Sequence, residues 1–259
     1  MNLNNKKVLV TGAGSGMGRE LTLELIRRGA KVIAVDMHKD ALTETASLAG
    51  SGVSTITLDV TDRNAVLALP SRIGTIDCLI NNAGIIQPFI PIKDLSMEQA
   101  EKVMNVNFYG PLTLIKALLP GLLNRPEAHI LNVSSMGAYA PVPGQSIYGA
   151  SKAALKLMTE GLRSELRDTN VGVTIVFPGA VATNITVNSE FEMPNVKGDA
   201  TAFKQTPASV AAKMMLDAIE KNKARITIGK DATMMDRLSR INPVFAANLI
   251  YKQMKSLLG

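Results

Sequence analysis

Short apolar runs rich in Val and Ile alternate along the chain with longer segments whose apolar residues recur every three or four positions. The short runs predict seven β-strands, at 7–11, 31–36, 53–60, 76–82, 129–135, 171–177 and 225–228. The helical pattern covers 18–29, 39–50, 61–69, 97–108, 111–123 and about 146–168. Strands that alternate with helices and are apolar on both faces are typical of parallel βαβ units. We therefore predict an α/β fold with a doubly wound parallel sheet of about seven strands.

Two segments depart from this alternating pattern. Residues 178–205 are the only long irregular stretch, and a loop of that length in a compact domain is usually functional. The tail at about 231–259 has a helical pattern, with Asn242 as a cap before Pro243 in the first turn. No linker, repeat or low-complexity tract interrupts the chain. We predict a single domain over 1–259, with a substrate loop at about 178–205 and a helical C-terminal tail.

Short polar sequences mark two other helix starts. Ser96 with Gln99 predicts a capping box, in which each side chain bonds the other residue's backbone N–H. Thr206 before Pro207 predicts a capped helix whose first turn holds the proline.

Composition narrows the class of protein. The chain is 46% hydrophobic with a formal net charge of +6, but Lys and Arg are scattered and Trp is absent, so we expect no nucleic-acid groove. The single Cys78 excludes an intramolecular disulfide, and the isolated His38 and His129 offer no metal-ligand spacing. The apolar run before Gly12 is too short for a signal peptide, and no run approaches the roughly 18 apolar residues of a membrane span. We expect a cytoplasmic protein.

The sequence TGAGSGMG at 11–18 follows the first predicted strand and opens the first predicted helix. Gly12, Gly16 and Gly18 would permit a tight turn, close approach of the backbone to a pyrophosphate, and close packing of helix on strand. The helix N-terminus would then offer amide donors to the phosphates. Asp36 ends the second predicted strand at the distance expected for a ribose-binding acid. Together these features favour dinucleotide binding over a plain structural turn.

Asp36 also indicates which dinucleotide is used. Its carboxylate can accept hydrogen bonds from ribose hydroxyls but would repel a 2′-phosphate. Ser15 occupies the middle of the glycine turn, which contains no Arg or Lys. Lys39 is nearby, but a flexible, exposed lysine is a weaker argument for binding a 2′-phosphate. The sequence therefore predicts NAD, with NADP as the less favoured cofactor.

Tyr148 and Lys152 are four residues apart, so on a helix the phenol and the ammonium share one face. The residues beside them are small, which leaves room for a ligand against that face. The same spacing occurs at Tyr251 and Lys255, so spacing alone does not separate an activated phenol from a surface pair.

The order of several short motifs resembles that of the short-chain dehydrogenase/reductase family, from about residue 6 to 230. The matching segments are TGAGSGMG at 11–18, DV at 59–60, NNAG at 81–84, NFYG at 107–110, NVSS at 132–135, YGASK at 148–152 and PGAVAT at 178–183. Each motif is modest by itself, but the ordered set is specific. The resemblance implies a single-domain Rossmann-type fold and an NAD(P)-dependent oxidoreductase acting on CH–OH or C=O groups. Tyr251 and Lys255 lie outside the matched region.

The resemblance also implies roles for individual residues. Tyr148 would exchange the proton on the substrate oxygen, Ser135 would orient that oxygen, Lys152 would bind the nicotinamide ribose and lower the pKa of the phenol, and Asn107 would hold a water next to Lys152. The implied cofactor-binding residues are Gly12, Ser15, Gly16, Met17, Gly18, Asp36, Asp59, Val60, Asn82, Ala83, Gly84, Tyr148, Lys152, Pro178, Val181 and Thr183.

The substrate follows less directly. Apolar residues fall where the resemblance places the substrate mouth: Ile85, Ile86, Met136, Tyr139, Val142, Ile185 and Val187. We expect hydride transfer between nicotinamide and a lipophilic secondary alcohol or ketone. Within the family, the alternative is a 3-oxoacyl carrier-protein reductase, which usually prefers NADPH and carries basic residues near the glycine turn. A non-catalytic NAD(H)-binding regulator is the alternative from another class.

The resemblance further implies a homo-oligomer, a tetramer or a dimer, in which the helices at 111–123 and 146–168 pair across a two-fold axis. Leu112, Leu114, Ile115, Leu118 and Leu119 give the first of these helices more apolar surface than one sheet face needs. In the tail, an apolar stripe predicts packing on the domain or on a neighbouring subunit, with membrane-surface contact as the less favoured alternative. The stripe consists of Ala247, Ile250, Met254 and Leu257.

Overall fold

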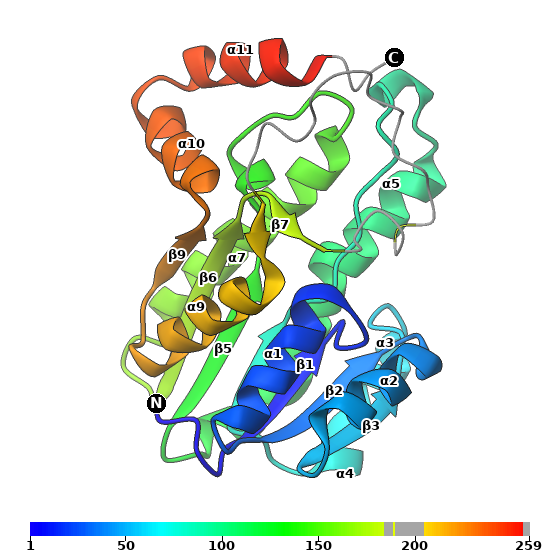
Figure 1. Ribbon diagram of the computed structural model, residues 1–259, viewed down its shortest axis with the longest axis vertical. Helices are drawn as coiled ribbons and strands as arrows, with labels where there is room; N and C mark the ends of the chain where they lie inside the picture. Colours follow the sequence, from blue (N-terminus) through cyan, green and yellow to red (C-terminus); the bar gives the residue numbers. More distant parts are fainter. Residues whose placement is uncertain (184–188, 190–204, 256–259) are drawn as a thin grey trace.

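The computed structural model describes residues 1–183, 189 and 205–255 (Figure 1). Its main sheet has seven parallel strands in the order β3-β2-β1-β4-β5-β6-β9. The strands are β1 (Lys7–Thr11), β2 (Lys31–Asp36), β3 (Val53–Thr57), β4 (Cys78–Asn81), β5 (Ala128–Val133), β6 (Val171–Pro178) and β9 (Arg225–Ile228). The predicted doubly wound parallel sheet is therefore confirmed, and every predicted strand is present, although β3 and β4 are shorter than their apolar runs.

Helices connect the strands and cover both faces of the sheet. They are α1 (Gly16–Arg27), α2 (Lys39–Ala49), α3 (Arg63–Leu67), α4 (Leu69–Ile73), α5 (Met97–Met104), α6 (Gly110–Leu123), α7 (Ser146–Glu165), α9 (Ala208–Glu220), α10 (Lys230–Ile241) and α11 (Pro243–Met254). A π-helical turn, η2 (Asn105–Tyr109), joins α5 to α6, and single 3₁₀ turns lie at η1 (Ile92–Asp94) and η3 (Met136–Ala138). A two-stranded pair, β7 (Val181–Ala182) with β8 (Thr206–Pro207), follows β6.

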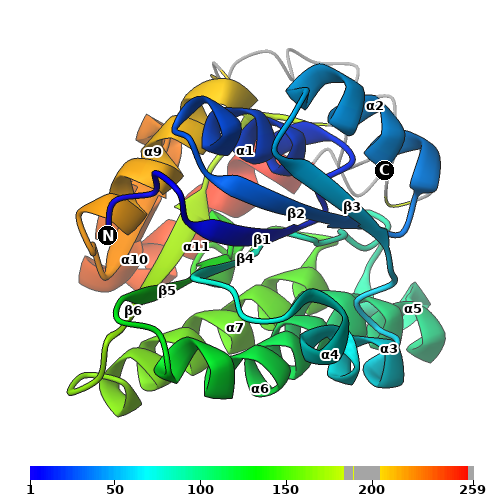
Figure 2. The same ribbon diagram turned by 90° about the horizontal axis from the view of Figure 1, so that it is seen from below.

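The two faces of the sheet have separate cores. Helices α1, α2 and α9 cover one face, and α3, α4, α6 and α7 cover the other (Figure 2). On the first face, Leu21 and Leu25 of α1 pack with Met215 of α9 against the buried strands. On the second, Leu118 of α6 and Leu162 of α7 do the same. Apolar residues on both faces of the central strands explain why the strand sequences read as nearly continuous hydrophobic runs.

The helix starts follow the predicted polar signals with one exception. Ser96 and Gln99 form both bonds of the capping box at α5. Asn242 accepts a hydrogen bond from the N–H of Phe245 at 2.9 Å and thereby caps α11. The prediction for Thr206 and Pro207 was wrong, because these residues form β8 and α9 begins at Ala208. The N–H of Thr206 bonds the carbonyl oxygen of Ala180, so pairing with β7 takes precedence over capping.

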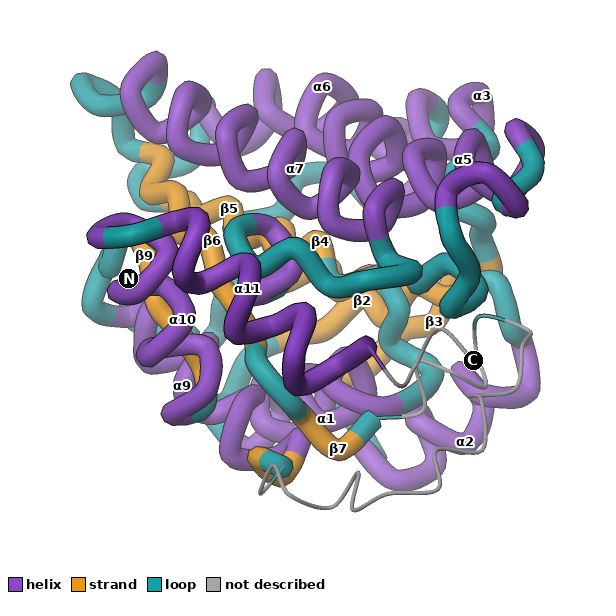
Figure 3. Tube along the Cα trace, turned by 90° about the horizontal axis from the view of Figure 1, so that it is seen from above, coloured by secondary structure: helices purple, strands orange, loops and turns teal. Residues whose placement is uncertain are grey.

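The C-terminal tail packs on the domain, as predicted. Helix α11 lies across the carboxyl ends of the strands (Figures 1 and 3). Its Ala246 and Ile250 are buried against Ala140 and against Met235 of α10. Of the predicted stripe, Ile250 and Met254 belong to this cluster, Ala247 is half-buried and its place in the cluster is taken by Ala246, and Leu257 lies outside the described residues.

Among the described residues, one continuous helical stretch, Met97–Leu123, has the length and composition of a membrane span, and 39% of its most apolar window is buried in the fold. This stretch comprises α5, η2 and α6, so it differs from the expectation that no run approaches such a length. Leu114, Ile115 and Leu118 of α6 are buried against the sheet, so core packing accounts for part of its apolar character. Leu112 and Leu119 are half-buried, which leaves less spare apolar surface than the sequence suggested.

Candidate functional site

The order of the strands reverses between β1 and β4, and in open α/β sheets ligands bind outside the carboxyl ends of the strands at such a point. Here the first residues after both strands are held together through Thr11. Its hydroxyl oxygen accepts hydrogen bonds from the N–H groups of Asn82 and Ala83, each at 3.1 Å. The Asn82 amide donates to the carbonyl oxygen of Thr11 at 3.0 Å. The NNAG segment thus fixes the base of the glycine turn.

Two glycines of this turn have no room for a side chain. Gly12 has a φ of +66°, and a Cβ there would lie 2.9 Å from the Cα of Ala83. A Cβ on Gly18 would lie 1.9 Å from the carbonyl oxygen of Gly12, so Gly18 permits the close packing of α1 on the turn that the sequence predicted. The turn therefore presents backbone and the N-terminus of α1 to whatever binds beside it.

A cavity runs along this end of the sheet and is lined by most of the residues predicted to bind the dinucleotide. Those residues are Gly12, Ser15, Gly16, Met17, Asp36, Asp59, Val60, Asn82, Ala83, Gly84 and Thr183. Gly18, Tyr148, Lys152, Pro178 and Val181 do not line it. Tyr148 lines the adjoining cavity described below. Lys152 is brought next to Gly84, and Pro178 is buried at the end of β6.

Sequence reasoning missed six residues that line the same cavity, namely Met37, His38, Leu58, Thr61, Lys102 and Val106, and it placed a seventh, Ile85, at the substrate mouth instead. Most of them adjoin a predicted position in the sequence, such as Met37 after Asp36 and Ile85 after Gly84, so proximity to the motifs was the available signal. Lys102 and Val106 come from α5 and η2, and no local motif marks them.

Asp36 is held rigidly at the rim of this cavity. One carboxylate oxygen accepts the N–H of Gly14 at 2.9 Å, and the other accepts the N–H of His38 at 3.0 Å. Arg19, one residue after the turn, forms a bidentate pair with Glu44, both bonds at 2.7 Å, and also donates to the carbonyl oxygen of Gly14 in the turn. Asp36 therefore presents a negative charge at the rim of the cavity, and the Arg19 guanidinium is already paired with Glu44.

The residues present fit a dinucleotide. The glycine turn leaves a side-chain-free cradle, the Asp36 carboxylate lines the same cavity as an acceptor, and the side-chain oxygen of Asn82 is buried with no hydrogen-bond partner. An unpaired buried acceptor costs about 1–3 kcal/mol, and a donor group on a ligand in this cavity would satisfy it.

Asn107 lies in the π-helical turn η2, and such turns are frequent at functional sites. It is fully buried and bonds the backbone of Ile85 twice, accepting its N–H at 2.9 Å and donating to its carbonyl oxygen at 2.8 Å. It also donates to the hydroxyl of Ser151 at 3.0 Å, and Ser151 donates to the carbonyl oxygen of Tyr148 at 2.7 Å. Asn107 thereby ties the NNAG segment to α7 beside Tyr148.

Lys152 is 4% exposed, and its ammonium donates to the carbonyl oxygen of Val133 at 3.1 Å. A Cβ on Gly84 would lie 3.0 Å from the Lys152 Nζ and 3.2 Å from the Asn107 Oδ1, so both side chains converge on this glycine. Burial lowers the pKa of Lys152 to about 8, because removing the ammonium from water disfavours its charged form.

Tyr148 and Ser135 face each other across the start of α7. Burial raises the pKa of Tyr148, and a hydrogen bond with Ser135 offsets part of that rise. Lys152 is not among the groups that shift this pKa in the chain by itself, and its effect on the phenol with a cofactor bound stays a prediction. A Cβ on Gly137 would lie 3.3 Å from the Tyr148 ring and 3.4 Å from the Ser135 hydroxyl, so η3 packs closely against both groups.

A second cavity opens at Tyr148 and Ser135. It is lined mainly by apolar residues: Ile86 and Phe89, Met136 and Val142, Met234 and Met235 of α10, and Ile250 and Met254 of α11. Of the predicted substrate mouth, Ile86, Met136 and Val142 line this cavity and Ile85 lines the dinucleotide cavity. Tyr139 instead packs on Phe177 and donates to the carbonyl oxygen of Ala232, and Ile185 and Val187 lie outside the described residues.

Gln87 supports the start of α7, and sequence reasoning missed it. It is 1% exposed, and its side-chain oxygen accepts the N–H groups of Ile147 at 2.8 Å and Tyr148 at 3.0 Å. These are first-turn donors that a helix cannot satisfy by itself. The Gln145 amide in turn donates to the carbonyl oxygen of Gln87 at 2.7 Å. Because Gln87 lies about sixty residues before the helix that it caps, no local pattern indicates this contact.

The other Tyr–Lys pair lies in a different environment. Tyr251 is 55% exposed on α11, and Lys255 at its C-terminus is exposed as well. Tyr251 and Lys255 have the same spacing as Tyr148 and Lys152 but are exposed, so this pair does not form a second buried site.

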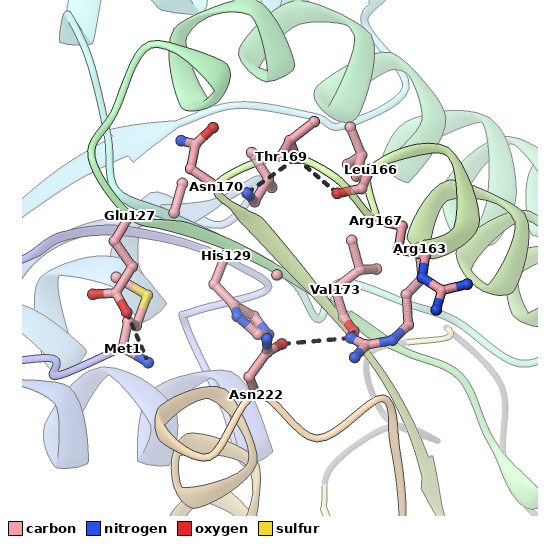
Figure 4. Close-up of a pocket in the computed structure, with 13 residues that line it drawn as sticks. Met1, Glu127, His129, Arg163, Leu166, Arg167, Thr169, Asn170, Val173 and Asn222 are labelled. Carbon is pink, nitrogen blue, oxygen red and sulfur yellow. Dashed lines mark hydrogen bonds and ion pairs between the residues drawn. The ribbon is translucent and has the colours of Figure 1, made fainter.

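A further cavity lies at the opposite, amino ends of β5 and β6 (Figure 4). It contains His129, which is 1% exposed and bonds the hydroxyl of Thr174 at 2.8 Å. Burial lowers the pKa of His129 to about 3, so the ring is neutral near pH 7. A Cβ on Gly172 would lie 2.4 Å from this ring, which indicates dense packing rather than an open site. Within the described residues, no cluster of three or more His, Cys, Asp or Glu forms a metal site.

Comparisons with known proteins agree with this geometry. A sequence profile described as short chain dehydrogenase matches residues 6–193. SadH of Mycobacterium tuberculosis, an oxidoreductase by name, is 35% identical over 250 residues, covering 91% of this chain and 90% of its own.

Two solved structures share the fold across nearly the whole chain. A short-chain dehydrogenase/reductase from Burkholderia phymatum in complex with NAD has a TM-score of 0.81 at 26% identity, covering 92% of this chain and 94% of that one. A short-chain dehydrogenase from Burkholderia cenocepacia in complex with NADP has a TM-score of 0.82 at 29% identity, covering 96% and 99%. The chain described here belongs to the short-chain dehydrogenase/reductase family of NAD(P)-dependent oxidoreductases.

Proposed function

We propose that this enzyme uses NAD to interconvert a hydrophobic secondary alcohol and its ketone. The observation that carries this proposal is the placement of Tyr148 and Ser135 at one end of a mainly apolar cavity. That cavity adjoins the dinucleotide cavity, since Ile85 lines one and Ile86 lines the other. A substrate carbon and a nicotinamide ring would therefore meet beside the two hydroxyl groups.

In the proposed mechanism, individual residues transfer the proton, orient the substrate oxygen and bind the cofactor. Bound NAD supplies the hydride acceptor, or the hydride donor when it is reduced. In ketone reduction, the Tyr148 hydroxyl donates its proton to the substrate oxygen while the Ser135 hydroxyl donates a hydrogen bond to the same oxygen. In alcohol oxidation, Tyr148 takes that proton instead. Lys152 and Asn107 lie beside Gly84. Lys152 would bind the nicotinamide ribose there, and Asn107 would hold a water that links Lys152 to solvent.

Asp36 supports the choice of NAD over NADP. Its two oxygens are held by backbone N–H groups, so the carboxylate cannot easily move away from a 2′-phosphate. Arg19, the nearest arginine, is paired with Glu44 and does not line the cavity. A phosphate would thus meet a fixed negative charge without a neutralising partner from the turn.

The lining of the second cavity supports a lipophilic substrate. Its large apolar side chains are methionine, isoleucine, valine and phenylalanine, and methionine adapts to irregular apolar shapes. Asp231 is the only charged residue among the described lining residues, and its carboxylate already accepts the N–H of Ala180 at 2.7 Å. No Lys or Arg of the described wall faces a substrate carboxylate or phosphate.

A cofactor-coupled panel tests the proposal. NADH oxidation would be followed with aliphatic, alicyclic and aryl ketones of increasing size, with short 2-oxoacids, and with a 3-oxoacyl thioester. We expect kcat/KM to rise with the apolar area of the ketone and to be lowest for the oxoacids. Turnover confined to the thioester would favour the carrier-protein reductase, and NADH binding without turnover of any member would favour a regulator.

A further inference from the structure

The corner between α10 and α11 exposes a group of large apolar side chains, which we call the corner patch: Ile241, Val244 and Phe245. Their exposed fractions are 83%, 69% and 54%, and all five residues from Ile241 to Phe245 are exposed. Scattered single apolar residues are normal on a protein surface, but three within five positions form a contiguous patch. The corner therefore exposes apolar area that the described fold does not cover.

An open apolar groove continues from this patch. Ile241 and Phe245 line it together with Met214 of α9, Met234 of α10 and Leu249 of α11. Met234 also lines the substrate cavity, so the surface groove and the substrate cavity meet at this side chain. The patch and the substrate cavity thus lie on opposite faces of the same pair of helices.

The charges around the patch have one sign. Between residues 237 and 255 the charged residues are Arg237, Arg240, Lys252 and Lys255, with no Asp or Glu. Lys230 and Arg237 line the groove itself, and both are exposed.

Neither carboxylate of α10 lines the groove. The side chain of Asp236 is 17% exposed and is paired with Arg225 and Arg240. Asp231 lines the substrate cavity and bonds the N–H of Ala180. Arg240 is paired with Asp236 of α10, so the basic groups outside this pair around the apolar patch are Lys230, Arg237, Lys252 and Lys255.

An apolar patch surrounded by basic residues favours some binding partners over others. A symmetric dimer through this patch would bring the basic groups of both copies close to one interface. An anionic lipid surface complements both features, because apolar side chains enter the acyl boundary while lysine and arginine reach the headgroups. We propose that the α10–α11 corner docks on the surface of an anionic lipid bilayer, with the substrate cavity next to the lipid.

Figures 1 and 3 place this corner at the end of the molecule that carries the site. Helix α11 lies over the carboxyl ends of the strands, and α10 flanks it at the edge of the fold. Docking through the corner would leave the opposite end, with the amino ends of β5 and β6, in water. The inference stands on surface geometry and charge, so it does not depend on the identity of the substrate.

Vesicle sedimentation of the full-length protein tests the proposal. The probes are phosphatidylcholine vesicles with and without phosphatidylglycerol. Ile241→Ser, Val244→Ser and Phe245→Ser together remove the apolar patch, whereas Lys230→Gln with Arg237→Gln removes charge and keeps the patch. The matched control is Leu48→Ser, Leu67→Ser and Ile92→Ser, at positions that are 59%, 50% and 62% exposed on other parts of the surface.

We expect the wild type and the control to sediment with the phosphatidylglycerol vesicles and to be released by high salt. Each patch variant should bind them at least about tenfold more weakly, with an unchanged melting temperature. Equal binding by the wild type and both patch variants, or no vesicle binding at all, would overturn the proposal. Light scattering adds a further decisive result: an oligomer that dissociates only in the triple serine variant would assign the patch to contact between copies instead.

Discussion

The ammonium of Lys152 lies 6.0 Å from the centre of the Tyr148 ring and bonds the carbonyl oxygen of Val133. This nearby positive charge favours the phenolate form of Tyr148. Burial opposes it by disfavouring both charged forms, which is why the pKa of Tyr148 is raised and that of Lys152 is lowered to about 8. Lowering the phenol pKa for catalysis therefore needs a further positive charge, and oxidised nicotinamide would bring one.

The first prediction concerns cofactor choice. NAD should exceed NADP in kcat/KM by at least about tenfold, because a carboxylate facing a phosphate at a partly wet rim costs about 1–3 kcal/mol. Asp36→Asn keeps the shape and removes the charge, so it should reduce this preference at least about fivefold. Asp40→Asn on α2 is the control and should leave the ratio unchanged. Steady-state kinetics with both cofactors decides the matter, and equal efficiencies in the wild type would refute our interpretation of Asp36.

The second prediction concerns acid stability. The folded-state pKa of His129 is lowered from 6.5 to about 3, so between these pH values the unfolded chain binds a proton that the folded chain does not. His129 therefore contributes stability that is present above pH 6.5 and is lost as the pH falls towards 3. The difference in pKa corresponds to about 5 kcal/mol.

Urea unfolding of the wild type and His129→Gln between pH 7 and pH 4 measures this contribution. The glutamine can still bond Thr174 but does not titrate, so the variant should lose less stability on acidification. His38→Gln, at an exposed position, should follow the wild-type curve. Parallel curves for wild type and His129→Gln would contradict the assignment.

The third prediction concerns assembly. The family resemblance implies a homo-oligomer formed through α6 and α7, and Leu157 on α7 is 69% exposed. Light scattering at micromolar concentration should give a dimer or a tetramer. Leu157→Glu should shift it to a smaller species, whereas Leu48→Glu on α2, which is 59% exposed, should not. A monomeric wild type would rule out this mode of assembly.

The sequence predicted most of the fold and the dinucleotide cavity because their signals are local. Gly12, Gly18 and Asp36 are recognised from a strand, a turn and a helix that are contiguous in the chain. The same holds for the capping box of Ser96 and Gln99, which the structure confirms.

Contacts between distant segments were not predictable in this way. Gln87 caps α7 from another part of the chain, and Lys102 reaches the cavity from α5 without a motif. The spacing of Tyr148 and Lys152 indicates a nearby ammonium but not the burial that raises the pKa of the phenol in the chain by itself. The leucines of α6 suggested a spare apolar face, yet Leu114 and Leu118 cover the sheet. In each case, contacts with residues distant in the sequence determined the role or the burial of the side chain.

The central claim is that buried Tyr148, and not exposed Tyr251, moves the substrate proton. Turnover of the best ketone in the panel should be measured for Tyr148→Phe and Tyr251→Phe, with NADH binding followed by fluorescence. We predict that Tyr148→Phe binds NADH but has no measurable turnover, and that Tyr251→Phe keeps kcat within about threefold of the wild type, a difference below about 1 kcal/mol. Turnover by Tyr148→Phe at the wild-type rate would contradict the account.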